Sequence, residues 1–304
     1  MNPLSVDIRN ISKSYGEVKA LSDVSLGIET GELFGLIGTD GAGKTSLFRI
    51  LTSLLLPDSG TASIVGFDVV KDYREIRKIT GYMAGRFSLY QDLTVEENMN
   101  FYATVFGTTV EENYDLVKDI YSHIEPFKNR RAGKLSGGMK QKLALSCALI
   151  HKPRILILDE PTTGVDAVSR KEFWEMLVRL KTNEITIMVS TPYMDEAEIC
   201  DRVALIQNGK ILSVDTPGNI IGQYKGKILA ISSPDLYSLK NDLESYVKTH
   251  SVYLFGQVLH LTIAEEESEK DLIKFLEKKG YKNLVVNKIS PNIEDCFLDL
   301  MVKA

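Results

Sequence analysis

The sequence lacks the features of a secreted or membrane-spanning chain and has no cysteine pattern that binds a metal. Its three cysteines, Cys147, Cys200 and Cys296, lie far apart and fit no metal-ligand spacing, so we expect reduced, packed thiols in a cytosolic protein. No apolar run approaches the about 20 residues that a membrane-spanning helix needs, and the first residues match no secretory signal. If the protein serves a membrane, we expect a partner to supply the membrane part.

A strong excess of charge of one sign is also missing. The net charge of the 304-residue chain is −5, which does not favour nucleic acid or an anionic membrane surface as the main partner. The hydrophobic fraction of 44% is ordinary for a globular protein, and the length allows a large core or two domains. Function must therefore be carried by local motifs.

A phosphate-binding loop is the most specific motif present. Residues 38–45 match G-x-x-x-x-G-K-[ST] between an apolar run at 33–37 and a helical stretch at 46–51, a context in which an accidental glycine-rich turn is not expected. Gly41 and Gly43 let successive N–H groups point inward, and the helix N-terminus completes an anion cradle. Lys44 would contact the β- and γ-phosphates, and the Thr45 hydroxyl would bind Mg²⁺. The predicted nucleotide contacts are Gly38, Thr39, Asp40, Gly41, Ala42, Gly43, Lys44, Thr45 and Ser46.

Two carboxylates follow a second apolar run. Residues 155–158 are four apolar residues, which predicts a strand buried on both faces in a parallel sheet. Asp159 and Glu160 follow at its carboxyl end, where α/β sheets bind their ligands. We expect Asp159 to hold Mg²⁺ through water and Glu160 to polarise the attacking water. Glu160 and Lys44 are therefore the candidate catalytic residues.

Two further features are ambiguous when taken alone. Ser136 can cap a helix over 139–150, and Gly137 and Gly138 leave N-terminal N–H groups exposed, which suits an anion. An ordinary capped helix start explains the same pattern. Tyr15, in a loop expected at 12–16, could stack on an adenine ring or pack on its own sheet.

Periodicity and turn residues predict the remaining elements. Strands are expected at 6–11, 22–29, 61–65, 79–83 and 184–190, and a hairpin at 204–213 turns at Asn208-Gly209. Helices are expected at 94–106, 110–124 and 169–181, with a capping box at Thr94. Residues from about 225 onward predict a small α+β domain. Its strands are expected at 227–231, 258–263 and 283–288, and its helices at 236–246, 271–279 and 293–301.

The order of the motifs resembles the nucleotide-binding subunit of an ABC transporter over about residues 4–220. The phosphate loop, the signature at 135–139, Asp159-Glu160 and the runs at 164–166 and 194–198 carry the resemblance. It implies an α/β fold of the P-loop NTPase (ABC ATPase) type with an antiparallel β subdomain and an inserted helical subdomain. The implied domains are an ABC ATPase domain at 1–222, with its helical subdomain at about 86–150, and a small α+β domain at 223–304.

The family's mechanism implies partners as well as a fold. Two such domains face each other as a homodimer or heterodimer, so Ser136, Gly137 and Gly138 would serve a partner's nucleotide, and Tyr15 falls at the adenine-stacking position. The implied cofactors are ATP and Mg²⁺. A transmembrane permease subunit would place the chain in the cytoplasm, peripheral on the inner face of the cell membrane. Residues 87–90 and 293–300 most resemble ATPase subunits of bacterial drug exporters.

Two positions depart from the family pattern. Gly85 stands where the family has Gln, and Pro192 stands where it has His, so two side chains that sense the γ-phosphate and the attacking water are absent. The first hypothesis is an energy-coupling ATPase of an export pump. The alternative is a clamp subunit with weak hydrolysis in an asymmetric complex. A soluble ABC protein acting on ribosomes or DNA is disfavoured, because such proteins carry two ATPase domains or a long coiled coil.

Overall fold

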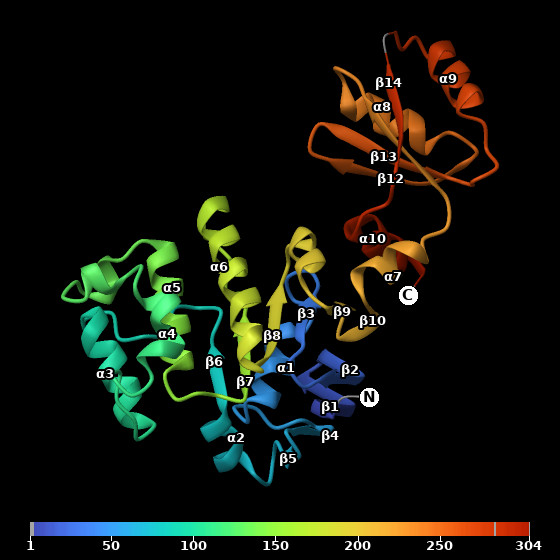
Figure 1. Cartoon of the computed structure of the whole chain (residues 1–304). Helices are drawn as coiled ribbons and strands as arrows, with labels where there is room; N and C mark the ends of the chain where they lie inside the picture. Colours follow the sequence, from blue (N-terminus) through green and yellow to red (C-terminus); the bar gives the residue numbers. More distant parts are fainter. Residues whose placement is uncertain (1–2, 283, 304) are drawn as a thin grey trace. The chain divides into compact units, whose positions relative to one another are not determined.

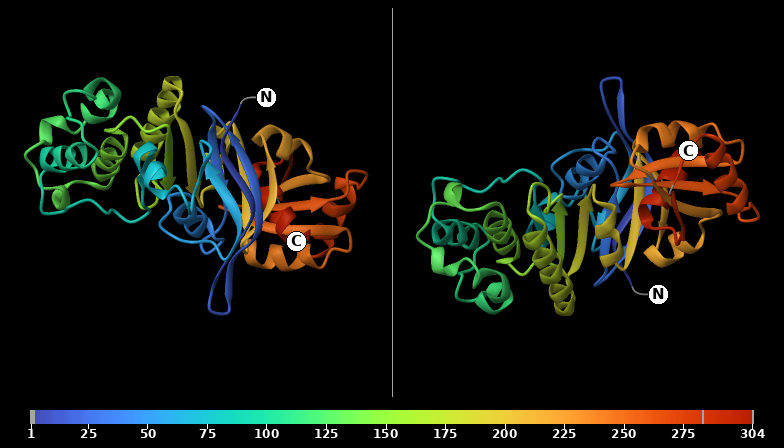
Figure 2. Two further views of the ribbon diagram at one scale, coloured as in Figure 1. Left: turned by 90° about the horizontal axis from the view of Figure 1, so that it is seen from below. Right: turned by 90° about the horizontal axis from the view of Figure 1, so that it is seen from above.

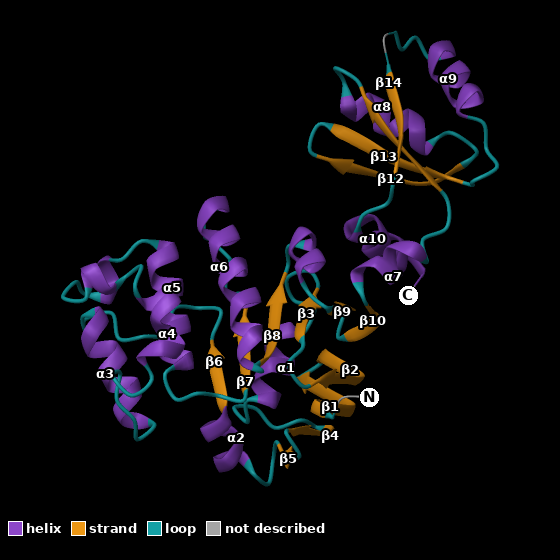
Figure 3. Ribbon diagram, in the orientation of Figure 1, coloured by secondary structure: helices purple, strands orange, loops and turns teal. Residues whose placement is uncertain are grey.

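The computed structural model describes residues 3–282 and 284–303 (Figure 1). The chain forms two compact units, one ending at Pro217 and the other beginning at Gly218. The first unit contains both helices and strands, with consecutive helices between β6 (Thr80–Met83) and β7 (Ile155–Asp159), and the second unit has its own sheet with helices (Figure 3). Within the described ranges, no helix is long and apolar enough to cross a membrane.

A six-stranded sheet forms the centre of the first unit (Figure 2). Its order is β10 (Lys210–Asp215), β9 (Arg202–Gln207), β3 (Leu33–Ile37), β8 (Thr186–Thr191), β7 (Ile155–Asp159) and β6 (Thr80–Met83). Neighbouring strands from β9 through β3, β8 and β7 to β6 run parallel to one another. Strand β10 pairs antiparallel with β9 across the turn at Asn208-Gly209, which confirms the predicted hairpin. All residues of β3, β7 and β8 are buried, as expected for strands covered on both faces.

The ends of three parallel strands meet at one edge of this sheet. Ile37 at the end of β3 pairs with Thr191 of β8, and Asp159 at the end of β7 pairs with Ser190 of β8. Residues that follow these strands therefore lie close together although they are far apart in sequence. This edge is where an open α/β sheet binds its ligands.

A second, antiparallel sheet is formed by strands between residues 4 and 68 of the first unit. Its order is β2 (Val18–Glu29), β1 (Leu4–Tyr15), β4 (Ser59–Ile64) and β5 (Phe67–Asp68). The loop expected at 12–16 is wrong, because β1 continues to Tyr15 and pairs there with Val18 of β2. Cross-strand pairing outweighs the polar local composition. Apolar side chains of this sheet, such as Ile8 and Leu26, form one core with Phe48 of the helix after the phosphate loop.

The helices of the first unit begin and end close to the expected positions. They are α1 (Lys44–Leu51), α2 (Tyr73–Ile79), α3 (Val95–Val105), α4 (Tyr114–Tyr121), α5 (Gly137–Leu149) and α6 (Ala167–Leu180), with short 3₁₀ turns η1 (Glu125–Phe127), η2 (Ala132–Lys134), η3 (Lys181–Asn183) and η4 (Met194–Ile199). The capping box is confirmed, because Thr94 Oγ1 accepts from Glu97 N and Glu97 Oε2 accepts from Thr94 N. The helix expected at 110–124 is shorter, and α2 was not predicted, since its seven residues bury one apolar side chain.

The second unit is a small α+β fold. Its sheet order is β12 (Thr249–Phe255), β13 (Val258–Ile263), β11 (Lys227–Ser232) and β14 (Val285–Ile289), and its helices are α7 (Pro217–Gly222), α8 (Leu236–Glu244), α9 (Glu269–Lys278) and α10 (Ile293–Lys303). Leu229, Leu261, Leu243 and Leu276 share one buried core of this sheet with α8 and α9. Strand β12 was missed by the sequence patterns. The expected strand at 283–288 begins at Val285, and residue 283 lies outside the described residues.

Candidate nucleotide-binding site

The phosphate loop connects the end of β3 to the start of α1 and adopts backbone conformations that require glycine. Gly41 and Gly43 have φ angles of 78° and 106°, in the left-handed region. A Cβ on Gly43 would also lie 2.4 Å from the Ala20 carbonyl oxygen. The loop borders a small cavity of about 150 Å³ lined by Ala20, Gly41, Ala42, Gly43, Lys44, Thr45, Ser46 and Glu160. The cavity thus joins the loop to the residue that follows β7.

Lys44 is held at the centre of this edge. Its side chain is 3% exposed, and Nζ donates to the carbonyl oxygens of Gly38 (2.8 Å) and Thr39 (3.0 Å). The third contact is an ion pair, in which Nζ lies 3.0 Å from Glu160 Oε1. An ammonium has three N–H donors, so all of them are occupied in this arrangement. An anion that reaches Lys44 must replace one of these contacts.

Asp159 and Glu160 are positioned by the neighbouring strand. Ser190 Oγ donates to Asp159 Oδ1 (2.7 Å), and the Glu160 N–H bonds to the Ser190 carbonyl oxygen (3.1 Å) and Oγ (3.0 Å). Asp159 is 2% exposed. Glu160 has φ 48°, a left-handed conformation that is strained for a residue with a Cβ and often occurs at functional sites. Sequence patterns did not identify Ser190 as the residue that orients both acids.

Gly85 lies directly beside Asp159. A Cβ built on Gly85 would be 3.1 Å from the Asp159 carbonyl oxygen and 3.8 Å from its carboxylate carbon. A longer side chain at this position would therefore start next to the Asp159 carboxylate. Because glycine has no side chain, residue 85 supplies no polar group beside the Asp159 carboxylate.

Pro192 follows β8, next to residues that are hydrogen-bonded to the buried carboxylate of Glu196. Thr191 Oγ1 donates to Glu196 Oε2 and accepts from the Tyr193 N–H (3.0 Å), and Thr162 Oγ1 donates to Glu196 Oε1 (2.9 Å). Glu196 is 2% exposed, and burial raises the pKa of its carboxyl although these hydrogen bonds oppose the shift. Thr162 and Glu196 were not singled out from the sequence as a network, because they are 34 residues apart.

Tyr15 lies close to the start of α1, whereas the signature residues Ser136 and Gly137 do not line the cavity at the phosphate loop. The Tyr15 side chain is 48% exposed, and its hydroxyl lies 3.3 Å from Ser46 Oγ, so the structure brings it to the start of α1. Ser136 caps α5 as predicted, with Oγ accepting from the Met139 N–H (3.4 Å). Ser136 and Gly137 are exposed and do not line the cavity at Lys44. Within one chain, the signature is therefore not joined to the phosphate loop.

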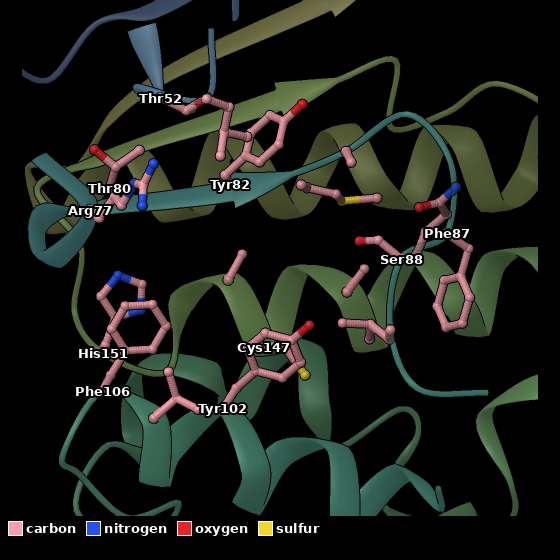
Figure 4. Close-up of a pocket in the computed structure, with 18 residues that line it drawn as sticks. Thr52, Arg77, Thr80, Tyr82, Phe87, Ser88, Tyr102, Phe106, Cys147 and His151 are labelled. Carbon is pink, nitrogen blue, oxygen red and sulfur yellow. The ribbon is translucent and has the colours of Figure 1, made fainter. Parts of the chain in front are cut away.

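A larger, mainly apolar groove of about 390 Å³ lies between β6, the loop that follows it, α3 and α5 (Figure 4). Tyr82, Phe87, Tyr102 and Phe106 are among its aromatic lining residues. His151 stacks on Phe106 with ring centroids 3.8 Å apart and planes at 8°. Burial lowers the pKa of His151 to about 4, so the ring is neutral near pH 7.

Known proteins match both the sequence and the geometry. A family model described as ABC transporter matches residues 21–163. The chain is 36% identical over 308 residues to the "Probable multidrug ABC transporter ATP-binding protein YbhF" of Escherichia coli (strain K12), covering 99% of this chain but 53%, about half, of that relative. It is 33% identical over 299 residues to the "Nod factor export ATP-binding protein I" of Burkholderia lata, covering 97% and 96% of the two chains.

Solved structures support the same assignment. CbiO1 of Clostridium perfringens, part of the ABC transporter complex cbiONQ, matches at 25% identity and TM-score 0.65, covering 72% of this chain and 91% of that one. The ATP-binding cassette MJ0796, in a dimeric post-hydrolysis state bound to ADP and Pi, matches at 26% identity and TM-score 0.63, covering 69% and 98%. The fold and site define an ABC ATPase cassette. This chain belongs to the ABC transporter family, among its ATP-binding proteins.

Proposed function

We propose that this chain is the ATP-binding subunit of a multidrug-type ABC exporter and couples ATP binding and hydrolysis to a separate membrane subunit. The observation that carries the proposal is the meeting of Lys44, Asp159 and Glu160 at one sheet edge, where the phosphate loop and Glu160 line the same cavity. The names of two relatives, one a probable multidrug ABC transporter ATP-binding protein and the other a Nod factor export ATP-binding protein, support the transport class. Residues 1–222 would act as the ATPase domain, with helices between about 86 and 150 inserted in it.

The residues at this edge suit a nucleotide with Mg²⁺. The Thr45 hydroxyl and the Asp159 carboxylate offer oxygen ligands, and no group of three His, Cys, Asp or Glu side chains in the described ranges is arranged for a metal alone. This set fits a cation that keeps several waters and binds through one or two protein oxygens and phosphates. When bound, Mg²⁺ would neutralise charge on the phosphates. Lys44 would hold the β- and γ-phosphates, and Glu160 would accept the proton of the attacking water.

The proposed assembly contains a second ATPase domain and a permease. Because Ser136 and Gly137 are exposed and absent from this chain's own cavity, we assign them, with Gly138, to a nucleotide on a facing domain. Tyr15 would stack on the adenine of the chain's own ATP, since its hydroxyl lies close to Ser46. The apolar groove beside His151 (Figure 4) would receive a helix of the permease. That contact would hold the chain at the inner face of the membrane. The small C-terminal domain would support this dimer or regulate it.

A comparison of ATP hydrolysis rates tests this function. One rate is measured on the purified chain, and the other on the chain in membranes that contain its co-purified permease. We expect hydrolysis in both, faster with the permease, and loss of both activities in Glu160→Gln. A chain that binds no ATP, or that co-purifies with no membrane protein, would refute the proposal. Glu175→Gln, an exposed carboxylate on α6, is the matched control and should leave both rates unchanged.

A clamp subunit with weak hydrolysis is the second candidate, and Gly85 favours it. Beside Asp159, residue 85 offers no polar side chain, and Pro192 adds no donor after β8. Losing one such donor costs about 10²–10³ in rate in other enzymes. Under this alternative the double variant Gly85→Gln, Pro192→His raises single-turnover hydrolysis at the chain's own site. An unchanged rate, or wild-type turnover already near 1–10³ s⁻¹, would exclude the clamp.

A further inference from the structure

The turn between β9 and β10 lies directly against the phosphate loop. A Cβ built on Gly38, at the start of the loop, would lie only 2.2 Å from the Ile206 carbonyl oxygen of β9. At the next position of each segment, Thr39 Oγ1 donates to Gln207 Oε1 (2.7 Å), although the two residues are 168 apart in sequence. Neither Ile206 nor Gln207 lines the cavity at Lys44. The proposed function therefore leaves this contact without a role.

Gly209 makes a second contact between the same turn and the loop. Its N–H donates to the Ala42 carbonyl oxygen (3.0 Å), and its own carbonyl oxygen accepts from the Ser22 N–H (2.8 Å). Gly209 is buried with φ 72°, and a Cβ there would lie 2.6 Å from the Ala20 carbonyl oxygen. Because only glycine fits at this position, the turn can lie between the loop and β2 and contact both.

The two contacts hold the loop on either side of its most exposed part. Residues 40–41 are exposed, and the residues before and after them, Thr39 and Ala42, are the ones bonded to the turn. The Thr39 carbonyl oxygen also accepts from Lys44 Nζ (3.0 Å) and from the Ala42 N–H (3.2 Å). The Gln207 side chain therefore fixes the residue whose carbonyl oxygen helps to place the Lys44 ammonium.

Fixing the loop in advance affects how tightly it can bind an anion. A loop that binds phosphate through backbone N–H groups must adopt one conformation, and the conformational freedom lost in doing so weakens binding. Gly41 and Gly43 have access to many backbone conformations, so an unsupported loop would lose much of this freedom. Contacts from outside the cavity reduce the loss without occupying a group that faces the ligand.

We propose that Gln207 is a positioning residue for ATP: its side chain holds Thr39, and through Thr39 the phosphate loop, in the conformation that receives the phosphates. The inference rests on the proposed function, in which this loop binds ATP. Gln207 acts through Thr39, because it does not line the cavity itself. The candidate base Glu160 is held by Ser190 instead. The contribution of Gln207 therefore falls on ATP affinity and not on the hydrolytic step.

A double-mutant cycle on the full-length chain tests the proposal. The wild type, Thr39→Val, Gln207→Met and the double variant are titrated calorimetrically with adenylyl imidodiphosphate, a non-hydrolysable ATP analogue, in Mg²⁺. Each single variant nearly keeps the side-chain shape and should bind the analogue about three- to tenfold more weakly, the effect of losing one neutral hydrogen bond. The double variant should bind no more weakly than the single variants, because both substitutions remove the same bond. Gln223→Met, at an exposed glutamine of the second unit, is the matched control and should bind as the wild type.

The dependence of hydrolysis on ATP concentration separates positioning from general damage to the fold. In Gln207→Met the half-saturating ATP concentration should rise about three- to tenfold, whereas the single-turnover rate at saturating ATP should match that of the wild type. A saturated rate that falls as much as the affinity would overturn the proposal. Equal analogue affinity in all four proteins, or losses that multiply in the double variant, would also overturn it and leave the proposed function intact. A wild type that binds no analogue would instead contradict the proposed function.

Discussion

Replacing Glu160 by glutamine tests two roles of this carboxylate at once. In the structure Glu160 Oε1 occupies one of the three donors of the Lys44 ammonium, and carbonyl oxygens of Gly38 and Thr39 occupy the others. The proposed role of Lys44 is to bind phosphate. Under the proposed function, Glu160 would compete with ATP for Lys44 before ATP binds and would act as the base once ATP is bound. Glutamine keeps the shape and removes the charge.

The size of each effect follows from the contacts. A hydrogen bond to a charged group contributes about 1.5–3 kcal/mol and a neutral one about 0.5–1.5 kcal/mol. Exchanging one for the other at Lys44 removes about 1–1.5 kcal/mol of competition, so ATP should bind about tenfold more tightly. An amide cannot take the proton of the attacking water, so hydrolysis should slow by about 10²–10⁴-fold. Glu160→Gln should therefore bind ATP more tightly and hydrolyse it more slowly than the wild type.

Equilibrium binding of ATP and single-turnover hydrolysis, measured on the same preparation, separate these effects. The control is Glu175→Gln, which makes the same charge change on the exposed side of α6. Weaker ATP binding in Glu160→Gln would show that the Lys44 contact does not oppose nucleotide entry. Hydrolysis at the wild-type rate would show that Glu160 is not the base.

Three other predictions follow from single contacts. Lys44→Ala should weaken ATP binding about 10²-fold or more, because a phosphate loses its charged hydrogen bonds, and a thermal shift with ATP as large as that of the wild type would contradict this. Thr94→Ala removes the cap of α3 and should lower the free energy of unfolding by about 1 kcal/mol in urea titrations, whereas no loss would mean that the cap is replaced by water. Burial raises the pKa of Glu196 above its ordinary 4.5, so the folded state binds its proton more tightly than the unfolded state. Stability from this residue should therefore fall as pH rises from 4.5 through the raised pKa, and Glu196→Gln should show a flatter melting-temperature profile over that window.

The sequence by itself determined the parts of the site that are contiguous. Residues 33–51 encode strand, loop and helix in order, and the structure has β3, the loop and α1 there. Glycines at positive φ and a capping residue such as Thr94 leave signals within a few positions, because backbone sterics and terminal hydrogen bonds act locally. The buried strand before Asp159 was likewise visible as a run of apolar residues.

Only the tertiary structure decided which of these parts meet. The pairing of β7 with β8 brings Ser190 to Asp159 and Glu160. Lys44 and its ion-pair partner Glu160 are 116 residues apart in the sequence. The place of Gly85 beside Asp159, the contact of Tyr15 with Ser46 and the extension of β1 through residues 12–15 also depend on strand pairing. Local patterns cannot encode such contacts, because register and burial arise from residues far apart in the chain.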